Sequence, residues 1–316
     1  MKFIKAIAKL LFQKQPLVSL CMTVKNGMPY LIDSLESIRS QTYKNIELVI
    51  QDCCSSDGTI DQIIDFSKRV KFPVHLISET DEGVADALNR TWKRAHGEIL
   101  MLADADNALL PNHVKTGVKF LLKNPDTAIA YTSHKIIDEK GNFLNDWIPN
   151  EFDFSKVVNG ELTPPSGSMI INKQLMINDL WYNTAKELGH VPDFDFWLRI
   201  GYKAYKVQRL KNITYCTRIS QSSGSCQIHR YDEFINSKFF AAKKFFSEND
   251  LSNYPDLSLN KCLAGILTWA SYHIYSAEGK TEKFTALMKE AYKLDPSSKT
   301  LKDLCIRSNF IDISII

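Results

Sequence analysis

The sequence predicts an α/β fold in which a largely parallel sheet has helices on both faces, followed by a helical C-terminal region. From residue 16 to about residue 136, short continuous apolar runs alternate with segments whose apolar residues recur at helical spacing. This alternation is typical of a parallel sheet that is buried on both faces. From about Tyr231 onward, the apolar residues recur only at helical spacing.

The first half of the chain is expected to contain four strand–helix units. Continuous apolar runs predict buried strands over residues 17–24, 46–50, 74–77 and 98–103. Helical spacing predicts helices over residues 28–38, from residue 60 onward, over 84–95 and over 111–122. Pro111 would lie in the first turn of the last of these helices, where proline is well tolerated.

The second half has a mixed pattern. We expect a strand over residues 166–171, a helix over 193–202 and a strand over 211–217. Residues 263–296 partly resemble one tetratricopeptide-type helix pair, although a plain helical hairpin fits equally well. The predicted organisation is an N-terminal segment over 1–15, a catalytic domain over 16–228 and a helical region over 229–316.

Composition restricts the class of protein. The 316 residues suit one large α/β domain with an appendage. A net charge of +3 lacks the strong basic excess of a nucleic-acid binder, so we expect no nucleic-acid partner. The seven cysteines are odd in number and form no C-x-x-C pair, and we expect no secretory signal. We therefore expect a reduced, cytoplasmic protein without a disulfide framework or a structural zinc site.

The N-terminal residues 1–14 form an amphipathic pattern. Phe3, Ile7 and Leu11 share one side, and the lysines lie mostly elsewhere. One interpretation is a helix on the anionic inner face of a membrane, which would make the protein peripheral there. A helix packed on the domain and a frayed terminus are the alternatives. No apolar run in the chain approaches the roughly 18 residues of a membrane span.

Candidate functional residues follow the predicted strands, because parallel sheets bind ligands outside the carboxyl ends of their strands. The segments at these ends are Lys25-Asn26, Gln51-Asp52, residues 79–81 and residues 104–106. Three of the four carry carboxylates. Carboxylates crowded at one sheet edge repel each other unless a cation or a hydrogen-bond donor lies among them.

The strongest single signal is Asp104-Ala105-Asp106, directly after a predicted strand. Two carboxylates one residue apart can face one divalent ion. Mg²⁺ and Mn²⁺ prefer oxygen ligands and are commonly bound together with substrate phosphates, so the pattern suits a nucleotide diphosphate. The alternative is a solvated turn before a helix that is capped near Asn107.

Two further segments carry weaker signals. Asp52 is placed to accept a hydrogen bond from a nucleobase imide, whereas Asp57-Gly58-Thr59 is expected to be a turn and helix start. Asp81 and Glu82 lie just before a predicted helix. The helix dipole favours negative charge there, so simple capping is the alternative to a binding role.

Together these segments resemble the inverting family 2 glycosyltransferases of GT-A fold, from Val18 to about Ser225. The motifs that match are Val18-Ser19 with Asn26, Asp52 with Ser55-Ser56-Asp57-Gly58-Thr59, the segment from Ser78 to Asn89, and Asp104-Ala105-Asp106. Four motifs in the family's order are far more specific than any one of them.

The resemblance implies a metal-dependent transfer of a sugar from a nucleotide diphosphate donor, with UDP favoured, to a hydroxyl of a glycan or lipid-linked acceptor in polysaccharide assembly. The anomeric centre would be inverted in a single displacement. Mn²⁺ or Mg²⁺ would be held by Asp106, as the more direct ligand, and Asp104. The donor-binding residues would be Thr23, Val24, Asn26, Asp52, Asp81, Asp86, Asp104 and Ala105.

Two later segments extend the resemblance. Residues 165–171 resemble the family's acceptor-side strand, and Asp193-Phe194-Asp195-Phe196-Trp197-Leu198-Arg199 resembles its E-D-x-D-x-W-L-R segment. This match implies that Asp193 is the catalytic base, with Asp195 the next candidate. A helix cap after Pro192 is the structural alternative for Asp193.

Three positions depart from the family pattern. Cys53-Cys54 replaces paired glycines, Pro192 replaces a glutamate before the base, and Arg218-Ile219-Ser220 replaces R-x-H. The histidine of that last motif is therefore absent, and His190 and His229 are its candidate substitutes.

Two rival functions are weighed against transfer. A nucleotidyltransferase or related enzyme typically carries a glycine-rich phosphate loop after the first strand, whereas residues 24–29 hold one glycine. A non-catalytic protein that binds a partner through its helical tail would not need Asp104, Asp106 and Asp193, which are all present.

Overall fold

The computed structural model describes residues 15–189, 191–220 and 230–308. The chain divides into two compact units. The first holds the sheet and comprises residues 1–151, 165–182 and 204–220, and the second, helical unit comprises 152–164, 183–203 and 221–316. The predicted amphipathic segment over 1–14, together with His190 and His229, lies outside the described residues.

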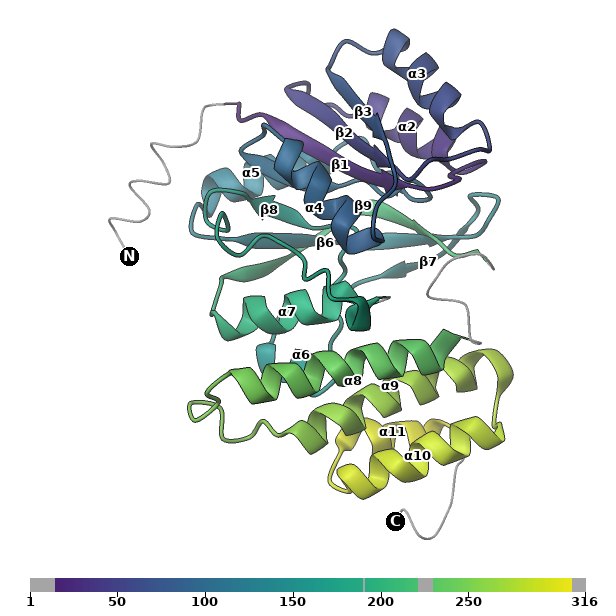
Figure 1. Cartoon of the computed structure of the whole chain (residues 1–316), viewed down its shortest axis with the longest axis vertical. Coiled ribbons are helices and arrows are strands. Elements are labelled where there is room, and N and C mark those ends of the chain that lie inside the picture. Colours follow the sequence, from purple (N-terminus) through teal and green to yellow (C-terminus); the bar gives the residue numbers. More distant parts are fainter. Residues whose placement is uncertain (1–14, 190, 221–229, 309–316) are drawn as a thin grey trace. The chain divides into compact units, whose positions relative to one another are not determined.

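The first unit contains a nine-stranded sheet in the order β3-β2-β1-β4-β8-β6-β9-β5, with β7 paired to β6 (Figure 1). Its first four strands are β1 (Val18–Val24), β2 (Ile46–Asp52), β3 (Val74–Ser78) and β4 (Ile99–Leu102). These strands pair in parallel, β1 with β2 and β4, and β2 with β3. The predicted parallel arrangement is confirmed for this half, with strand bounds close to those expected.

The rest of the sheet is mixed. It consists of β5 (Ala108–Leu109), β6 (Ile129–Ile137), β7 (Phe143–Trp147), β8 (Ile170–Asn172) and β9 (Val207–Arg218). Strand β8 runs antiparallel to β4 and β6, while β6 and β9 are parallel. Strands β4, β6 and β9 share one direction, while β8, β7 and β5 run against their neighbours, so the second half is less parallel than the apolar pattern suggested. Strands β5, β6 and β7 were not expected.

Four helices cover the sheet: α2 (Leu31–Arg39), α3 (Thr59–Arg69), α4 (Val84–Arg94) and α5 (His113–Lys123). Alternate residues of β1 enter one buried cluster with apolar residues of α2, α3 and α5. Helix α4 covers the other face, where Thr91 hydrogen-bonds with Cys21 of β1. The predicted helices on both faces are therefore confirmed. Pro111 precedes α5, whose N-cap residue is Asn112.

The second unit is helical throughout its described part. It contains α6 (Phe154–Val158), a 3-10 helix η1 (Lys186–Leu188), α7 (Pro192–Tyr202), α8 (Tyr231–Glu248), α9 (Leu259–Glu278), α10 (Glu282–Leu294) and α11 (Lys299–Arg307). Helices α9 and α10 pack together as a hairpin. The predicted C-terminal helices are confirmed, and residues 152–164 and 183–203 join them in one compact unit. Within the described ranges, no helix has both the length and the apolar character needed to cross a bilayer.

Candidate active site

The parallel register brings the predicted strand ends together. Asp52, the last residue of β2, pairs with Val24 of β1 and Ser78 of β3. Leu102 of β4 pairs with Cys21 on the other side of β1, and Asp104 follows two residues later. Segments that are far apart in sequence therefore meet at one edge of the sheet, where open α/β sheets bind their ligands.

Asp52 is fully buried beneath this edge. Its Oδ2 accepts hydrogen bonds from the Ser78 hydroxyl at 2.6 Å and from the Ser55 backbone N–H at 3.0 Å. Its Oδ1 is buried and has no hydrogen-bond partner among the residues that the structure describes. A buried acceptor without a donor is unfavourable, so Oδ1 is a candidate to accept a hydrogen bond from a ligand.

Asn26 and Asp57 tie the loop after β1 to the loop after β2. Asn26 donates its backbone N–H to the Ser55 hydroxyl at 2.7 Å, and its Oδ1 accepts from the Ser56 N–H at 2.9 Å. Asp57 accepts from the Met28 N–H at 2.9 Å. Gly58, with a φ of 94°, is the N-cap of α3. Residues 57–59 therefore form the structural turn that was predicted. Asn26 helps to connect this loop to the loop after β1.

A pocket of about 350 Å³ lies beside these two hydrogen-bonded loops, at the N-terminal end of α4. Its walls come from the ends of β1 and β2 and from the start of α4. The lining residues are Thr23, Val24, Lys25, Cys53, Asp81, Gly83, Val84 and Ala87. Three predicted donor-binding residues, Thr23, Val24 and Asp81, thus line one pocket. Lys25 adds a positive charge suited to an anionic ligand.

Asp81 and Asp86 both accept hydrogen bonds from the backbone just before α4. Asp81 accepts from the Gly83 N–H at 3.0 Å, and Asp86 accepts from the Glu82 N–H at 3.1 Å. Asp86 also forms an ion pair with Arg90 at 2.8 Å. Both bonds go to the two residues just before α4, which agrees with the structural alternative given for Asp81. Asp81 lines the pocket as well.

Asp104 is held by side chains from distant parts of the chain. Its Oδ2 accepts from the Tyr215 hydroxyl at 2.5 Å and from the Asn107 side-chain amide at 3.0 Å. The Ser34 hydroxyl of α2 donates to its backbone carbonyl. Gly167 passes so close that a Cβ there would lie 2.6 Å from Asp104 Oδ2. The carboxylate of Asp104 therefore has a fixed orientation, which a solvated turn residue would not have.

Asp106 lies half-buried beside Asp104, with Ala105 between them. Burial, and then the negative charge of Asp104, raise the pKa of Asp106 to about 6, against lowering contributions from its own backbone and from Arg218. Two carboxylates that resist ionising together are the donor set that a hard divalent cation would relieve. The residues present therefore fit Mg²⁺ or Mn²⁺.

Arg218 braces the Asp106 loop from the end of β9. It donates to the backbone carbonyls of Asp106, Asp138 and Glu139 and forms an ion pair with Asp33 at 2.8 Å. The antiparallel pairing of β5 with β9 brings Arg218 and Tyr215 to this place. From the sequence, Arg218 is noted only as part of a departing motif and Tyr215 is not predicted, since a pairing across more than 100 residues leaves no local signal.

Asp193 belongs to the second unit, in the first turn of α7 after Pro192. The N-cap residue is Val191, and Asp193 accepts a hydrogen bond from the Phe194 N–H at 2.9 Å. Asp193 is half-exposed, whereas Asp195 is buried and pairs with Arg199 at 2.8 Å. Of these two carboxylates, Asp193 is the one that remains accessible to an acceptor.

Lys238 of α8 carries a buried charge in the same unit. Its Nζ lies 3.7 Å from the centre of the Trp269 ring. Burial lowers the pKa of Lys238 to about 8, while the carboxylate of Asp193 opposes this shift. The carboxylate of Asp193 thus favours the charged form of Lys238.

Part of the chain matches the model of a known protein family. The family model for glycosyl transferase family 2 matches residues 19–181, just over half of the chain. The chain belongs to glycosyl transferase family 2. The match spans β1 to β8, and with them the pocket, Asp52 and the Asp104–Asp106 pair.

Relatives and solved structures agree with this assignment. An uncharacterised glycosyltransferase of Rickettsia bellii is 25% identical over 75% of this chain, and the putative glycosyltransferase EpsE of Bacillus subtilis is 28% identical over 61% of it and 70% of its own length. The chain spans 34% to 40% of the length of three Rickettsia relatives.

Two solved structures share the fold. The S. aureus TarS structure in complex with UDP-GlcNAc has a TM-score of 0.61 at 17% identity, covering 91% of this chain and 83% of its own. The Pyrobaculum calidifontis mannosyltransferase in complex with GDP-Man and Mn²⁺ has a TM-score of 0.58 at 16% identity, covering 98% and 91%. At these identities the likeness shows the fold, and it confirms the GT-A architecture with C-terminal helices.

Proposed function

We propose that the protein is a metal-dependent, inverting glycosyltransferase that uses a nucleotide diphosphate sugar, with UDP as the preferred nucleotide. The observation that carries the proposal is the pair Asp104 and Asp106. Tyr215 and Asn107 orient Asp104, and the pKa of Asp106 is raised to about 6. Two half-buried carboxylates whose negative charges repel each other are suited to bind a divalent cation beside a diphosphate.

The donor site would extend along the same sheet edge. Thr23, Val24 and Asp81 line the pocket beside α4, where we place the nucleoside. Asp52 would accept from the base, because its Oδ1 lacks a partner among the described residues. Asn26 and Asp86 would act by shaping the pocket walls, and Ala105 by leaving room between the two aspartates. A relative in fold binds UDP-GlcNAc and another binds GDP-Man with Mn²⁺, which supports a nucleotide-sugar donor.

Asp106 and Asp104 would hold Mn²⁺ or Mg²⁺. The bound ion would neutralise charge on the departing diphosphate, which is the Lewis-acid contribution of such metals. The chain itself would contribute by holding the two aspartates in place. Tyr215 and Gly167 fix Asp104, and Arg218 fixes the backbone of Asp106. A site prearranged in this way loses little freedom when the donor binds.

Asp193 would act as the base that takes the proton from the acceptor hydroxyl. Its half-exposed carboxylate sits on a helix whose following residues are buried, so its backbone is held by packing. Asp195 is already used in the ion pair with Arg199. The acceptor would be a hydroxyl of a glycan or lipid-linked intermediate in polysaccharide assembly, a role that rests on family membership.

A thermal-shift panel of UDP, GDP, dTDP and their sugars, with and without Mn²⁺, tests the proposal. UDP compounds should raise the melting temperature most, and Mn²⁺ should enlarge the shift. A ligand at about 100 times its dissociation constant adds roughly 2.7 kcal/mol of stability. Asp106→Asn should remove the metal-dependent part. Asp61→Asn, at an exposed carboxylate of α3, is the matched control. Metal dependence that survives in Asp106→Asn would reject the site assignment.

A further inference from the structure

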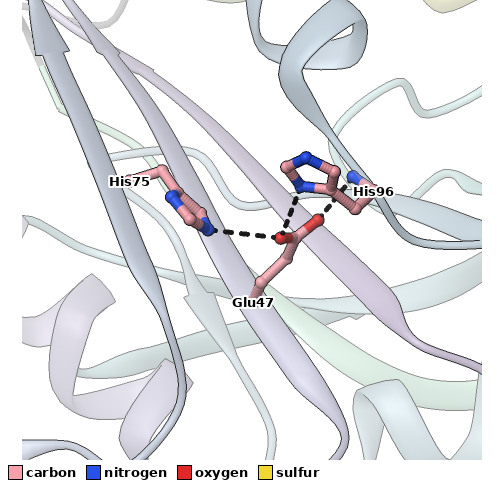
Figure 2. Close-up of side chains that lie close together, drawn as sticks. All are labelled: Glu47, His75 and His96. Atoms are coloured by element: carbon pink, nitrogen blue, oxygen red, sulfur yellow. Dashed lines mark hydrogen bonds and ion pairs between the residues drawn. The ribbon is translucent and has the colours of Figure 1, made fainter.

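Glu47, His75 and His96 gather at the opposite end of the strands from the nucleotide site (Figure 2). Glu47 is the second residue of β2, His75 is the second residue of β3, and His96 follows α4. Glu47 pairs in register with Ser19, and His75 with Val49 two residues further along β2. Because side chains alternate across a sheet, Ser19, Glu47 and His75 project on the same face.

The carboxylate of Glu47 is fixed by one of its oxygens. Oε1 accepts from the Ser19 hydroxyl at 2.5 Å and from the His96 backbone N–H at 2.7 Å. These bonds direct Oε2 toward the two imidazole rings, as Figure 2 shows. The Glu47 side chain is only 3% exposed, so these two donors hold its carboxylate in a fixed position.

Both imidazoles approach the same oxygen. His96 Nδ1 lies 3.2 Å and His75 Nε2 lies 3.4 Å from Oε2. A charge-assisted N–H···O bond is usually shorter, at about 2.7–2.9 Å. Zinc ligands at about 2.0–2.2 Å in tetrahedral geometry lie about 3.3–3.5 Å apart. The two distances therefore resemble the edges of a metal tetrahedron more closely than two strong hydrogen bonds.

The third edge of the cluster joins the two histidines, and the three ligand atoms all lie within 4.8 Å of one another. Binding of one ion would bring the two histidine nitrogens to about 3.3–3.5 Å from each other. The histidine side chains are 46% and 71% exposed, so their rings can rotate and solvent can reach the ion. Two neutral imidazoles and one carboxylate, with a fourth position for water, form a ligand set that suits Zn²⁺.

We propose that Glu47, His75 and His96 bind a Zn²⁺ ion at a site separate from the nucleotide site. Asp52 comes five residues after Glu47 along β2, and at the usual rise of a strand this separates the two residues by about 16 Å. The ion would join β2, β3 and the segment after α4. Ser19 and the His96 backbone would hold the ligand Glu47 from behind, as outer hydrogen bonds do in metal sites.

Titration of the tag-free full chain with Zn²⁺ by calorimetry tests the proposal, and Co²⁺ serves as the spectroscopic probe. We expect one saturable site and the visible absorption of four-coordinate Co²⁺. His75→Ala and His96→Ala should each weaken binding at least tenfold and remove that absorption. Both side chains are exposed, so these variants should fold. Excess Mg²⁺ should not displace Zn²⁺, because Mg²⁺ prefers oxygen ligands.

Asp106→Asn is the matched control, since it alters the other candidate metal site. It should leave the Zn²⁺ affinity and the Co²⁺ absorption unchanged. Zn²⁺ binding that is equally strong in both histidine variants would overturn the proposal, as would a wild-type chain that shows no saturable Zn²⁺ binding. Zn²⁺ binding that is lost in Asp106→Asn and kept in the histidine variants would place the ion at the nucleotide site and overturn it as well.

Discussion

The hydroxyl of Tyr215 lies 2.5 Å from Oδ2 of Asp104, although the two residues are 111 positions apart. Tyr215 is buried, and its burial and the charge of Asp104 raise the pKa of its hydroxyl well above the ordinary value. The phenol therefore stays protonated and donates. One oxygen of Asp104 is fixed by this bond, so the direction of its carboxylate is set by β9.

Tyr215→Phe tests this positioning. The substitution keeps the ring and removes the hydroxyl, so Asp104 loses its strongest donor while the core stays filled. We expect Mn²⁺-dependent UDP binding to weaken about tenfold to a hundredfold, the usual effect of losing a partner of a metal ligand. Metal-independent UDP binding should change little. Calorimetric titrations with and without Mn²⁺ measure both, and equal losses in the two would indicate a general structural effect.

Gly167→Ala tests how closely the chain passes Asp104. A Cβ at this position would lie 2.6 Å from Asp104 Oδ2 and 2.7 Å from the Tyr215 hydroxyl oxygen. Both contacts are far inside van der Waals distance, so the carboxylate must move. We expect Mn²⁺-dependent binding to fall by at least tenfold, with a stability loss of about 1–3 kcal/mol from overpacking. Denaturant unfolding and Mn²⁺ titration measure these effects, and unchanged Mn²⁺ affinity would contradict the role given to Asp104.

The pKa of Asp106 predicts how stability depends on pH. Its ordinary value of 3.8 is raised to about 6, mainly by burial and then by Asp104. Between these values the folded protein binds more protons than the unfolded chain, so stability without metal should fall as pH rises from about 4 to 6 and then level off. The total effect is on the order of 2–3 kcal/mol.

Asp106→Asn should remove this fall, so that the metal-free variant is more stable than the wild-type chain at pH 7. Urea unfolding in the presence of a chelator, between pH 4.5 and 7.5, measures the difference. Mn²⁺ should act in the opposite direction, because a metal ligand must lose its proton. The Mn²⁺-dependent shift should therefore grow from pH 5 to pH 7. A wild-type chain and variant with parallel pH profiles would contradict the raised pKa.

The sequence predicted the first half of the sheet because β1, β2 and β4 are continuous apolar runs, which local pattern detects. It missed β6, where Thr132, Ser133 and His134 are buried polar residues that break the apolar run. It also missed β7, whose residues are all exposed. Burial of this kind depends on partners elsewhere in the chain, such as the hydroxyl of Ser168 that contacts His134 at 2.8 Å.

The residues of the candidate site likewise fall into those that local sequence patterns predicted and those that they missed. Asp104 and Asp106 were predicted from local spacing after a strand. Tyr215 and Gly167, which orient Asp104, and Arg218, which braces Asp106, come from segments 60 to more than 100 residues away. No local pattern marks them, because Tyr215 and Arg218 are placed by the antiparallel pairing of β5 with β9, and Gly167 lies just before β8, which pairs with β4.

Asp193→Asn tests the proposed base against the role of a structural residue. Asparagine keeps an oxygen that can accept the hydrogen bond from the Phe194 N–H, but it cannot take a proton. We expect UDP binding and melting temperature to stay close to those of the wild-type chain, while transfer to the acceptor falls by roughly 10² to 10⁴. Initial rates of transfer at saturating donor measure this loss.

Asp195→Asn is the comparison that separates the two carboxylates of α7. Asp195 is buried and pairs with Arg199 at 2.8 Å, so its substitution removes this buried ion pair. We expect a stability loss of about 1–3 kcal/mol, since Arg199 keeps some contact with solvent. The transfer rate of the folded fraction should fall much less than in Asp193→Asn. If Asp193→Asn transfers at a normal rate and Asp195→Asn does not, the base is Asp195, and the ion pair with Arg199 must open during the reaction.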